Sequence, residues 1–291
     1  MTRETTGALY YYQIVTKQNL DTKTVEGFGI EWNRFDQLSV PPAEFDVLFQ
    51  QYFSVFDFAM VGPLAEGFDA GCGSGRWARG VAPRVGVLHC IDASAQALEV
   101  ARANLSPFSN CRFHLASVDE MPFHDNSMDF GYSLGVLHHL PDPAQGLKSC
   151  TAKLKPGAPF LLYLYYAFDN RPLWFRFLWR VSNVGRLAIS RLPARLRLLL
   201  ADLAAVVIYW PLARTARLLE RLGFDVSLLP LSFYRDRSFY TMRTDALDRF
   251  GTRVEHRFSR RQILEMMAAA NLADIRFSES PPFWCAVGRR A

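Results

Sequence analysis

Short apolar runs alternate with amphipathic stretches through the middle of the chain. Five runs are continuous enough to be strands buried on both faces of a sheet: the entry to Asp69 and residues 85–91, 111–116, 128–134 and 159–166. Stretches with a helical pattern lie between them, at residues 76–81, 95–105 and 144–154. Strands that alternate with helices predict a parallel, doubly wound α/β sheet with right-handed crossovers.

Two amphipathic stretches precede this region. Phe28, Trp32 and Phe35 recur at helical spacing before a double proline, and residues 43–58 repeat the same kind of pattern. Two interpretations of the first stretch stay open: a helix that caps the core, or a helix whose aromatic side chains also close over a bound ligand. Residues 1–20 have no strong period and predict an irregular or strand-like arm.

The end of the chain returns to the alternation of helix and strand. Residues 259–271 predict a helix with Ser259 as its N-cap, because a serine hydroxyl accepts a hydrogen bond from the first helical turn. Residues 274–278 and 283–287 predict two short strands around a Ser-Pro-Pro turn. We expect this hairpin to complete the sheet in the antiparallel direction.

An arginine-rich helical pattern replaces the alternation from residue 168 to about residue 257. Residues 171–221 contain ten arginines, no lysine and two acids, Asp202 and Glu220. The apolar run at residues 198–210 has about 13 residues, fewer than the roughly 18 to 20 that span a bilayer, so we do not expect a transmembrane helix.

Two interpretations of this insertion stay open. It is a helical lid packed on the sheet domain, with arginine stems covering apolar surface, or a lid whose basic, aromatic surface also lies on an anionic membrane. No nucleic-acid recognition motif accompanies the arginines, so we do not expect nucleic-acid binding.

Length and composition limit the number of domains. A chain of 291 residues that is 50% hydrophobic can bury one full core and a sizeable addition. We expect an arm with cap helices (1–60), an α/β core (61–167), the lid insertion (168–257) and a helix with a hairpin (258–291). Five cysteines without a CxxC pair argue against a disulfide framework or a cysteine zinc site, and the start lacks a signal-peptide pattern, so we expect the cytoplasm.

A glycine turn follows the first predicted strand. Gly71, Gly73 and Gly75 stand at alternate positions, where glycine permits positive φ and lets a ligand approach the backbone. Alone, this is a weak signal, because several nucleotide-binding folds use related turns. Asp92, at the end of the next strand, can accept both hydroxyls of a ribose that lies on the turn, and it can also cap the helix that begins near Ser94.

These features, taken with further motifs, resemble a class I S-adenosylmethionine (SAM) dependent methyltransferase of the type 11 group, which includes ubiquinone and menaquinone methyltransferase-like enzymes. The matching motifs are Asp69-Ala-Gly-Cys-Gly-Ser-Gly75, Ile91-Asp92, Met121-Pro-Phe123, Met128-Asp129-Phe130, Gly135-Val-Leu-His-His139 and Leu154-Lys-Pro-Gly157. The resemblance implies a Rossmann-like methyltransferase fold: a mostly parallel, seven-stranded sheet with a helical insertion after the fifth strand.

The resemblance also implies a set of residues that bind SAM. The methionine part would lie on the turn, the ribose on Asp92, and the adenine beside Ala93 and a loop in which Ser117 stands where the family normally has an aspartate. The full set is Asp69, Ala70, Gly71, Cys72, Gly73, Gly75, Asp92, Ala93, Ser117, Val118, Asp119, Ser133, Leu134 and Gly135.

Methyl transfer from a sulfonium is an in-line displacement, so the protein mainly has to align the reactants and exclude water. Some acceptors also need a general base, for which the candidates are His138, His139 and Asp169, although His139 could equally be a packing residue. The candidates for substrate contact are Trp32, Tyr165, Asn170, Arg171, Arg243 and His256. No histidine and carboxylate cluster has metal-ligand spacing, so we expect no metal.

The leading hypothesis is a SAM-dependent methyltransferase acting on an oxygen, nitrogen or carbon atom of a small-molecule or lipid-like acceptor. The alternative is a non-catalytic SAM-binding scaffold or regulatory protein that the basic insertion recruits to a membrane or partner. Both place the protein in the cytoplasm, and the alternative adds peripheral membrane contact through residues 171–221.

Overall fold

The structure is a computed structural model that describes residues 9–11 and 19–291, and most of the predicted N-terminal arm lies outside these residues. The chain divides into two compact units. The sheet unit contains the described residues up to residue 37 and residues 47–167 and 254–291, and the helical unit contains residues 38–46 and 168–253. The sequence pattern assigned residues 38–46 to the N-terminal cap and ended the insertion at residue 257, so the observed division differs at both points.

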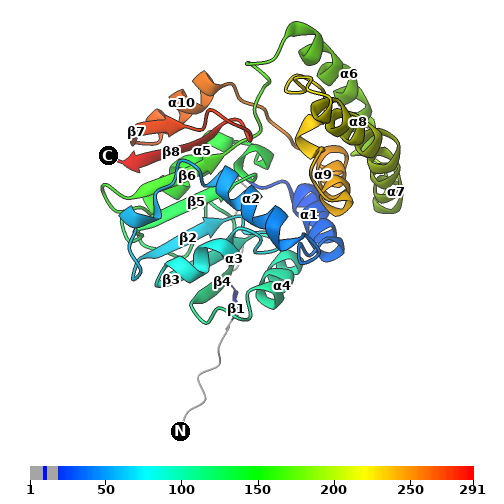
Figure 1. The fold of residues 1–291 in the computed structure, drawn as a ribbon. Helices are drawn as coiled ribbons and strands as arrows, with labels where there is room; N and C mark the ends of the chain where they lie inside the picture. Colours follow the sequence, from blue (N-terminus) through cyan, green and yellow to red (C-terminus); the bar gives the residue numbers. More distant parts are fainter. Residues whose placement is uncertain (1–8, 12–18) are drawn as a thin grey trace. The chain divides into compact units, whose positions relative to one another are not determined.

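The sheet unit is built on eight strands in the order β1-β4-β3-β2-β5-β6-β8-β7 (Figure 1). The strands are β1 (Leu9–Tyr11), β2 (Glu66–Ala70), β3 (Val87–Asp92), β4 (Cys111–Leu115), β5 (Phe130–Leu134), β6 (Pro159–Tyr163), β7 (Leu272–Phe277) and β8 (Cys285–Arg290). The first six pair in parallel, and β8 is antiparallel to both β6 and β7. This confirms the mostly parallel sheet and the closing hairpin.

The seven predicted strands are all present, and one short strand of the N-terminal arm adds an eighth. The additional strand is β1, which pairs in parallel with β4 through Leu9 and Phe113 at the edge of the sheet. Three residues are too few to give a periodic signal. The other seven strands are those that the sequence pattern predicts, although β3 begins two residues later than expected and β6 ends at Tyr163.

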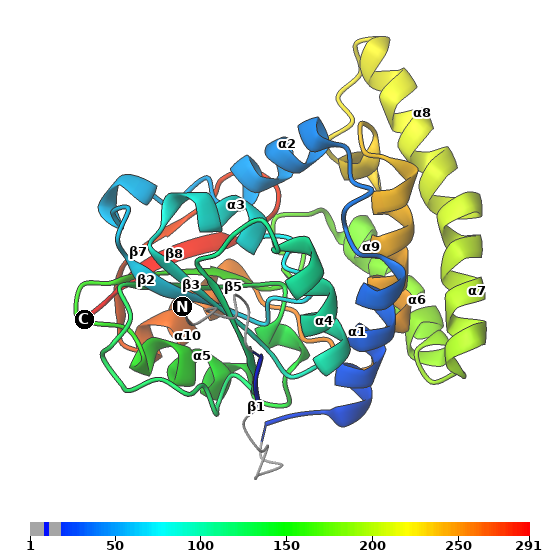
Figure 2. The same cartoon turned by 90° about the horizontal axis from the view of Figure 1, so that it is seen from below.

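Helices cover both faces of this sheet. Helices α5 (Pro143–Ala152) and α10 (Arg260–Ala269) pack with the buried side chains of Phe68 and Phe160 in one apolar cluster. Figure 2 shows α3 (Ala78–Val81) on the opposite face, where α4 (Ala95–Asn104) also contacts β3 and β4. Ser259 is the N-cap of α10, as expected, because its hydroxyl accepts a hydrogen bond from the Gln262 backbone N–H.

The helices that precede β2 differ in length from those the pattern predicts. Helix α1 (Thr22–Arg34) starts earlier than Phe28, and Asp21 caps it by accepting from the Thr24 N–H at 2.7 Å. Helix α2 (Pro42–Tyr52) is followed by η1 (Phe58–Met60). All five cysteines are free and buried.

The helical unit consists of α6 (Leu173–Ile189), α7 (Ala194–Ala204), η4 (Ala205–Tyr209), α8 (Trp210–Arg221), η5 (Ser232–Tyr234) and α9 (Phe239–Gly251). Its small core includes Ala205, Tyr209 and Met242. Glu44 fastens residues 38–46 to the start of α9, since its carboxylate accepts hydrogen bonds from the Ser238 N–H and the Thr241 hydroxyl at 2.9 and 2.7 Å.

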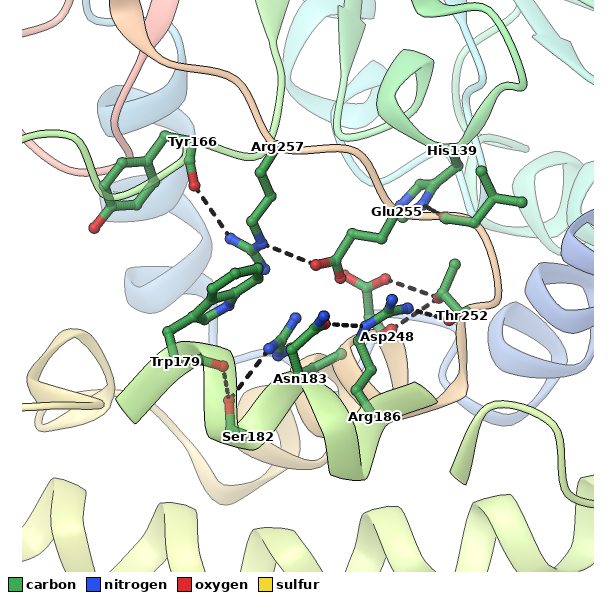
Figure 3. Close-up of polar contacts among 12 residues, drawn as sticks. His139, Tyr166, Trp179, Ser182, Asn183, Arg186, Asp248, Thr252, Glu255 and Arg257 are labelled. Atoms are coloured by element: carbon green, nitrogen blue, oxygen red, sulfur yellow. Dashed lines mark hydrogen bonds and ion pairs between the residues drawn. The ribbon is translucent and has the colours of Figure 1, made fainter. Parts of the chain in front are cut away.

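Polar groups also hold the helices of this unit together. The Arg186 guanidinium of α6 donates to the Thr252 carbonyl at 2.9 Å and to Asn183 Oδ1 at 2.7 Å (Figure 3). Arg243 of α9 forms a bidentate ion pair with Asp202 of α7, with N–O distances of 2.9 and 3.2 Å.

Segments α7, η4 and α8 form one continuous helix, Ala194–Arg221, of 28 residues. By length and composition it could cross a membrane, and it alone has this property in the described part of the chain. The apolar run at residues 198–210, from which we expected no transmembrane helix, is shorter than this helix, which continues on both sides of it. Only 22% of its most apolar window is buried.

Candidate functional site

The glycine turn between β2 and α3 is closed by its own hydrogen bonds. Gly71, Gly73 and Gly75 all have positive φ (82°, 53° and 75°), which L side chains rarely adopt. The N–H groups of Gly71 and Cys72 both donate to the Ile91 carbonyl at 2.8 Å. A Cβ on Gly71 would lie 2.3 Å from Val136 Cγ1. Glycine is therefore required here by both backbone conformation and packing.

The helix that follows the turn is shorter than the sequence predicts. Helix α3 has four residues, Ala78–Val81, and the predicted start at Arg76 is not helical. A helix dipole grows with the number of aligned peptide units, so α3 contributes little positive potential to the turn. The backbone of the turn and nearby side chains must then provide most of the ligand contacts.

Asp92 connects the turn to the end of β3. Its Oδ2 accepts a hydrogen bond from the Gly73 N–H at 2.9 Å, and its Oδ1 accepts one from the Ser94 N–H at 2.8 Å. Burial raises the pKa of Asp92, and the N–H groups of Ser94, Gly73 and Ala93 oppose this shift. The side chain is still partly exposed. Each carboxylate oxygen retains a second lone pair, so Asp92 can bind two further hydroxyl groups.

Asp69, at the end of β2, is buried more deeply than Asp92, with 1% of its surface exposed. Burial raises the pKa of Asp69 to about 8, the Tyr132 hydroxyl lowers it, and the nearby charge of Asp92 adds to the increase. Asp69 is therefore mostly a neutral acid at pH 7. Its neighbour Cys72 is also buried, which raises the pKa of that thiol to about 11.

The end of β5 lies beside the glycine turn, because β5 pairs with β2. The Ser133 hydroxyl donates to the Ala70 carbonyl at 2.8 Å and joins the two strand ends. After Leu134, Gly135 has a φ of 80°, and a Cβ built on it would meet no atom within 4 Å. The backbone of Gly135 is therefore open to a ligand.

The candidate adenine residues follow the ends of β3 and β4. Ser117 and Val118 are largely buried. The Asp119 carboxylate accepts a hydrogen bond from the Ser149 hydroxyl of α5 at 2.5 Å. Because the Asp119 carboxylate already has this hydrogen-bond partner, Ser117 and Val118 are better candidates than Asp119 for contact with a ligand.

Two aromatic side chains of α1 lie over this region. Phe28 stacks on Trp32 with ring centroids 6.5 Å apart, and it contacts His139 at 4.9 Å. The Trp32 Nε1 atom lies 2.9 Å from the position that a Cβ on Gly73 would occupy. Helix α1 thus brings its aromatic face to the glycine turn, which fits the ligand-closing interpretation as well as the capping one.

The sequence pattern gave no indication of the residue that fixes α1 to the turn. The Asn104 side-chain amide, at the end of α4, donates to the Asp36 carbonyl at 2.6 Å and to the Ser74 carbonyl at 2.8 Å. One side chain therefore joins the loop after α1 to the glycine turn. A helix-terminal asparagine is common, so spacing alone could not have identified this role.

A second cluster lies beyond the ends of β5 and β6. His138 is fully buried and stacks on Tyr165 at 3.9 Å. Burial lowers the pKa of His138 well below the usual value, and the charges of His139, Arg257 and His256 add to this effect. The imidazole is therefore neutral at physiological pH. His139 donates from Nδ1 to the Val254 carbonyl at 2.7 Å, if that nitrogen carries the proton.

Residues 254–258 complete this cluster, and two of their side chains were missed by the sequence pattern. Arg257 Nε lies 2.8 Å from Glu255 Oε1 (Figure 3). The guanidinium is 5.1 Å from the centre of the Tyr165 ring. The Glu255 side chain is 1% exposed. The backbone N–H of His256 donates to the His138 carbonyl at 2.9 Å. The segment has no hydrophobic period, so its sequence does not predict these contacts. They form because Phe258 pairs with Tyr166, just beyond the end of β6.

The remaining candidates belong to the helical unit: Asp169, Asn170, Arg171 and Arg243. Arg171 donates to the Ser227 carbonyl at 2.5 Å, and Arg243 is paired with Asp202 as described above. Both arginines therefore have structural partners that the sequence did not indicate. In residues 19–291 no three His, Cys, Asp or Glu side chains are grouped so that they could hold a metal ion.

Comparisons with known proteins bear on this site. Residues 68–162 match the family model of the methyltransferase domain Methyltransf_11. Phosphoethanolamine N-methyltransferase 2 of Caenorhabditis elegans is 34% identical over 100 residues, which are 33% of this chain and 23% of the relative. A ubiquinone biosynthesis O-methyltransferase of Alkalilimnicola ehrlichii is 36% identical over 91 residues, 31% of this chain and 37% of the relative. The chain therefore matches well under half of each relative's length.

A solved structure supports the same fold over more of the chain. It is a methyltransferase in complex with a Haloferax volcanii methyltransferase activator, with a TM-score of 0.50 and 15% identity over 90% of this chain and 97% of that chain. Residues 68–162, which match the family model, contain the glycine turn, Asp92 and Gly135. Residues 68–162 of this chain are therefore similar to the type 11 methyltransferase domain and to ubiquinone biosynthesis O-methyltransferases.

Proposed function

We propose that the protein is a SAM-dependent methyltransferase that transfers a methyl group to an oxygen, nitrogen or carbon atom of a small-molecule or lipid-like acceptor. The hydrogen bond from the Gly73 N–H to Asp92 carries this proposal, because it joins the two parts of a SAM site before any ligand binds. A site that needs little ordering loses little of its binding free energy to conformational entropy.

The residues present fit SAM in the sheet unit. We assign the ribose hydroxyls to the Asp92 carboxylate, the methionine part to the turn after Asp69, and the adenine to the region of Ala93, Ser117 and Val118. The open side of Gly135 leaves room beside the methionine end. Bound SAM would supply an electrophilic methyl group on a sulfonium.

The protein's own part in this reaction is alignment and exclusion of water. Phe28 and Trp32 cover the glycine turn and would keep water from the reacting atoms. Where an acceptor must lose a proton, His138 is the base that we favour, because its buried imidazole is neutral and its two ring nitrogens make no hydrogen bond within the described residues. His139 and Asp169 remain alternatives.

Binding of SAM provides the first test. Isothermal titration calorimetry with the wild-type chain should detect SAM binding, and its absence from folded protein would sink the proposal. The Asp92→Ala variant should bind SAM about 10- to 100-fold more weakly, since hydrogen bonds to a charged group contribute about 1.5–3 kcal/mol. Asp125→Ala is the matched control, because it removes an exposed carboxylate that pairs with Lys153, and it should leave the affinity unchanged.

Turnover separates the enzyme from a non-catalytic scaffold. Release of S-adenosylhomocysteine with an added acceptor would establish catalysis, and binding of SAM without turnover across oxygen, nitrogen and carbon acceptors would favour the scaffold.

We also propose that the protein works in the cytoplasm, at the membrane periphery.

A further inference from the structure

Helix α6 exposes six large apolar side chains on one side. Leu173, Trp174, Phe177, Leu178, Val181 and Val184 are all exposed, Leu173 by 78% and Val184 by 69%. At 100° per residue these six positions fall within an arc of about 140°. The other side of α6 is mostly at least partly buried and includes the apolar Phe175 and Trp179 together with the polar Asn183 and Arg186. Helix α6 is therefore apolar on its exposed side as well, whereas a surface helix of a water-soluble domain exposes a polar side.

The continuous helix α7–η4–α8 also exposes large apolar side chains. Its fully buried positions are mainly alanines: Ala201, Ala204, Ala205, Ala213 and Ala216. In its middle the exposed positions are large and apolar: Leu199, Leu203, Val206, Val207, Ile208 and Trp210. In water, leucine and valine are among the residues most often buried. Small residues between helices and large apolar residues on the outside are the arrangement found where helices meet lipid.

Both helices pack on α9 and so have only one side free. Helices α6 and α7, together with η4, contact α9. The inner sides use polar pairs, such as Arg243 with Asp202 and the Arg197 guanidinium with the Gly251 carbonyl at 2.8 Å. The twelve exposed residues named above on α6 and α7–η4–α8 are called the apolar face below.

The charge of the same segment indicates what covers this face. Residues 168–253 contain fifteen arginines, no lysine and seven acids, a net charge of +8, whereas the whole chain carries +5. The positive charge is therefore concentrated in this segment, and the rest of the chain is slightly acidic. Arginine binds phosphate groups through two parallel N–H donors. An apolar face within a cationic segment is complementary to an anionic phospholipid surface.

We propose that the apolar face lies in the plane of an anionic membrane, with its side chains inserted between lipid headgroups and acyl chains. A crossing of the bilayer by Ala194–Arg221 is disfavoured, because it would place both the Asp202–Arg243 ion pair and the guanidinium of Arg197 at hydrocarbon depth. Helix α9, which packs against this helix, would also have to enter the bilayer. This inference does not depend on methyl transfer.

Vesicle flotation tests the proposal with the full chain. The protein should float with vesicles of phosphatidylcholine and phosphatidylglycerol at low salt, bind pure phosphatidylcholine more weakly, and lose part of its binding at high salt as the arginines are screened. The absence of flotation with anionic vesicles at low salt would overturn the proposal.

Paired substitutions test which side chains insert. The Phe177→Ser/Leu203→Ser variant should bind anionic vesicles at least about tenfold more weakly, because two large apolar side chains are lost from the interface. The control is Leu64→Ser, which removes an equally apolar side chain, 90% exposed, outside residues 168–253. Both variants should keep the wild-type circular dichroism and unfolding midpoint, since all three positions are exposed. Equal binding by the double variant and the wild type would contradict the assigned face.

Three further measurements separate the alternatives. Lipids with brominated acyl chains should quench Trp174 and Trp210, and Trp174→Phe/Trp210→Phe should remove most of that quenching. Alkaline carbonate should release the protein from the vesicles, whereas retention would indicate a membrane-spanning helix. In lipid-free buffer the mass by light scattering should be the same for the wild type and the Phe177→Ser/Leu203→Ser variant. A wild-type dimer that this variant dissociates would assign the face to a second copy of the chain.

Discussion

Two aspartates at adjacent strand ends of the proposed SAM site, Asp69 and Asp92, differ in burial and in hydrogen bonding. Asp92 is partly exposed and accepts backbone hydrogen bonds that favour its charged form. Asp69 is enclosed, and burial raises its pKa to about 8. Two neighbouring carboxylates that both ionised would repel each other across the turn. A neutral Asp69 removes this repulsion and so favours the charged form of Asp92, although burial raises the pKa of Asp92 as well.

The neutral state of Asp69 predicts how stability depends on pH. The folded state holds a proton that the unfolded state has lost, so the free energy of unfolding falls as pH rises from about 4 to about 8. The slope from this one group is at most about 1.4 kcal/mol per pH unit. Asp69→Asn should remove it, so the variant should gain stability relative to wild type between pH 6 and pH 8 in urea unfolding. Parallel curves for the two proteins would show that Asp69 is ionised when folded.

His138 gives a second prediction at the residue scale. Because burial lowers its pKa well below the usual value, its ring should stay neutral from pH 6 to pH 8, and its nitrogen-15 shifts should not move in that range. With an acceptor that needs deprotonation, His138→Gln should lower kcat by about 10²- to 10⁴-fold and leave the affinity for SAM intact. The exposed His124→Gln variant is the control. A kcat for His138→Gln equal to wild type would leave His139 or Asp169 as the base.

At the scale of elements, α1 depends on a single bridging side chain. Asn104 joins the loop after α1 to the glycine turn, and Trp32 of α1 covers Gly73. Loss of this bridge would release the aromatic cover without removing any ligand-binding group. The position of α1 should therefore affect SAM affinity indirectly.

The chain offers a closely matched control for this idea. Asn110 also donates to two backbone carbonyls, those of Ala82 and Val85, both at 2.9 Å, but it does not contact the turn. Asn104→Ala and Asn110→Ala should each lower the free energy of unfolding by about 1–3 kcal/mol. Only Asn104→Ala should also weaken SAM binding in calorimetry, by about threefold or more. Equal SAM affinities in the two variants would argue that α1 plays no part in binding.

At the scale of the whole molecule, the sequence predicts the sheet better than it predicts the helical unit and the contacts between distant segments. Alternating strands and helices have strong local signals, and the glycine turn requires positive φ, so the order of the core and the place of Asp92 could be read from the chain. The length of Ala194–Arg221 could not be read from its apolar run, because such a run does not mark the ends of a helix. Glu255, Arg257 and Asn104 depend on contacts between distant segments, and no local pattern encodes such contacts.

The burial of all five cysteines has a practical consequence for work on the helical unit. A thiol-reactive dye should find little native cysteine to react with in the folded protein, so a single cysteine introduced at Leu203 or Phe177 can be labelled in the otherwise native chain. An environment-sensitive fluorophore at either position would then report the polarity around one chosen side chain. Because the native cysteines of the sheet unit stay unlabelled, the fluorescence would come from the chosen position in the helical unit alone.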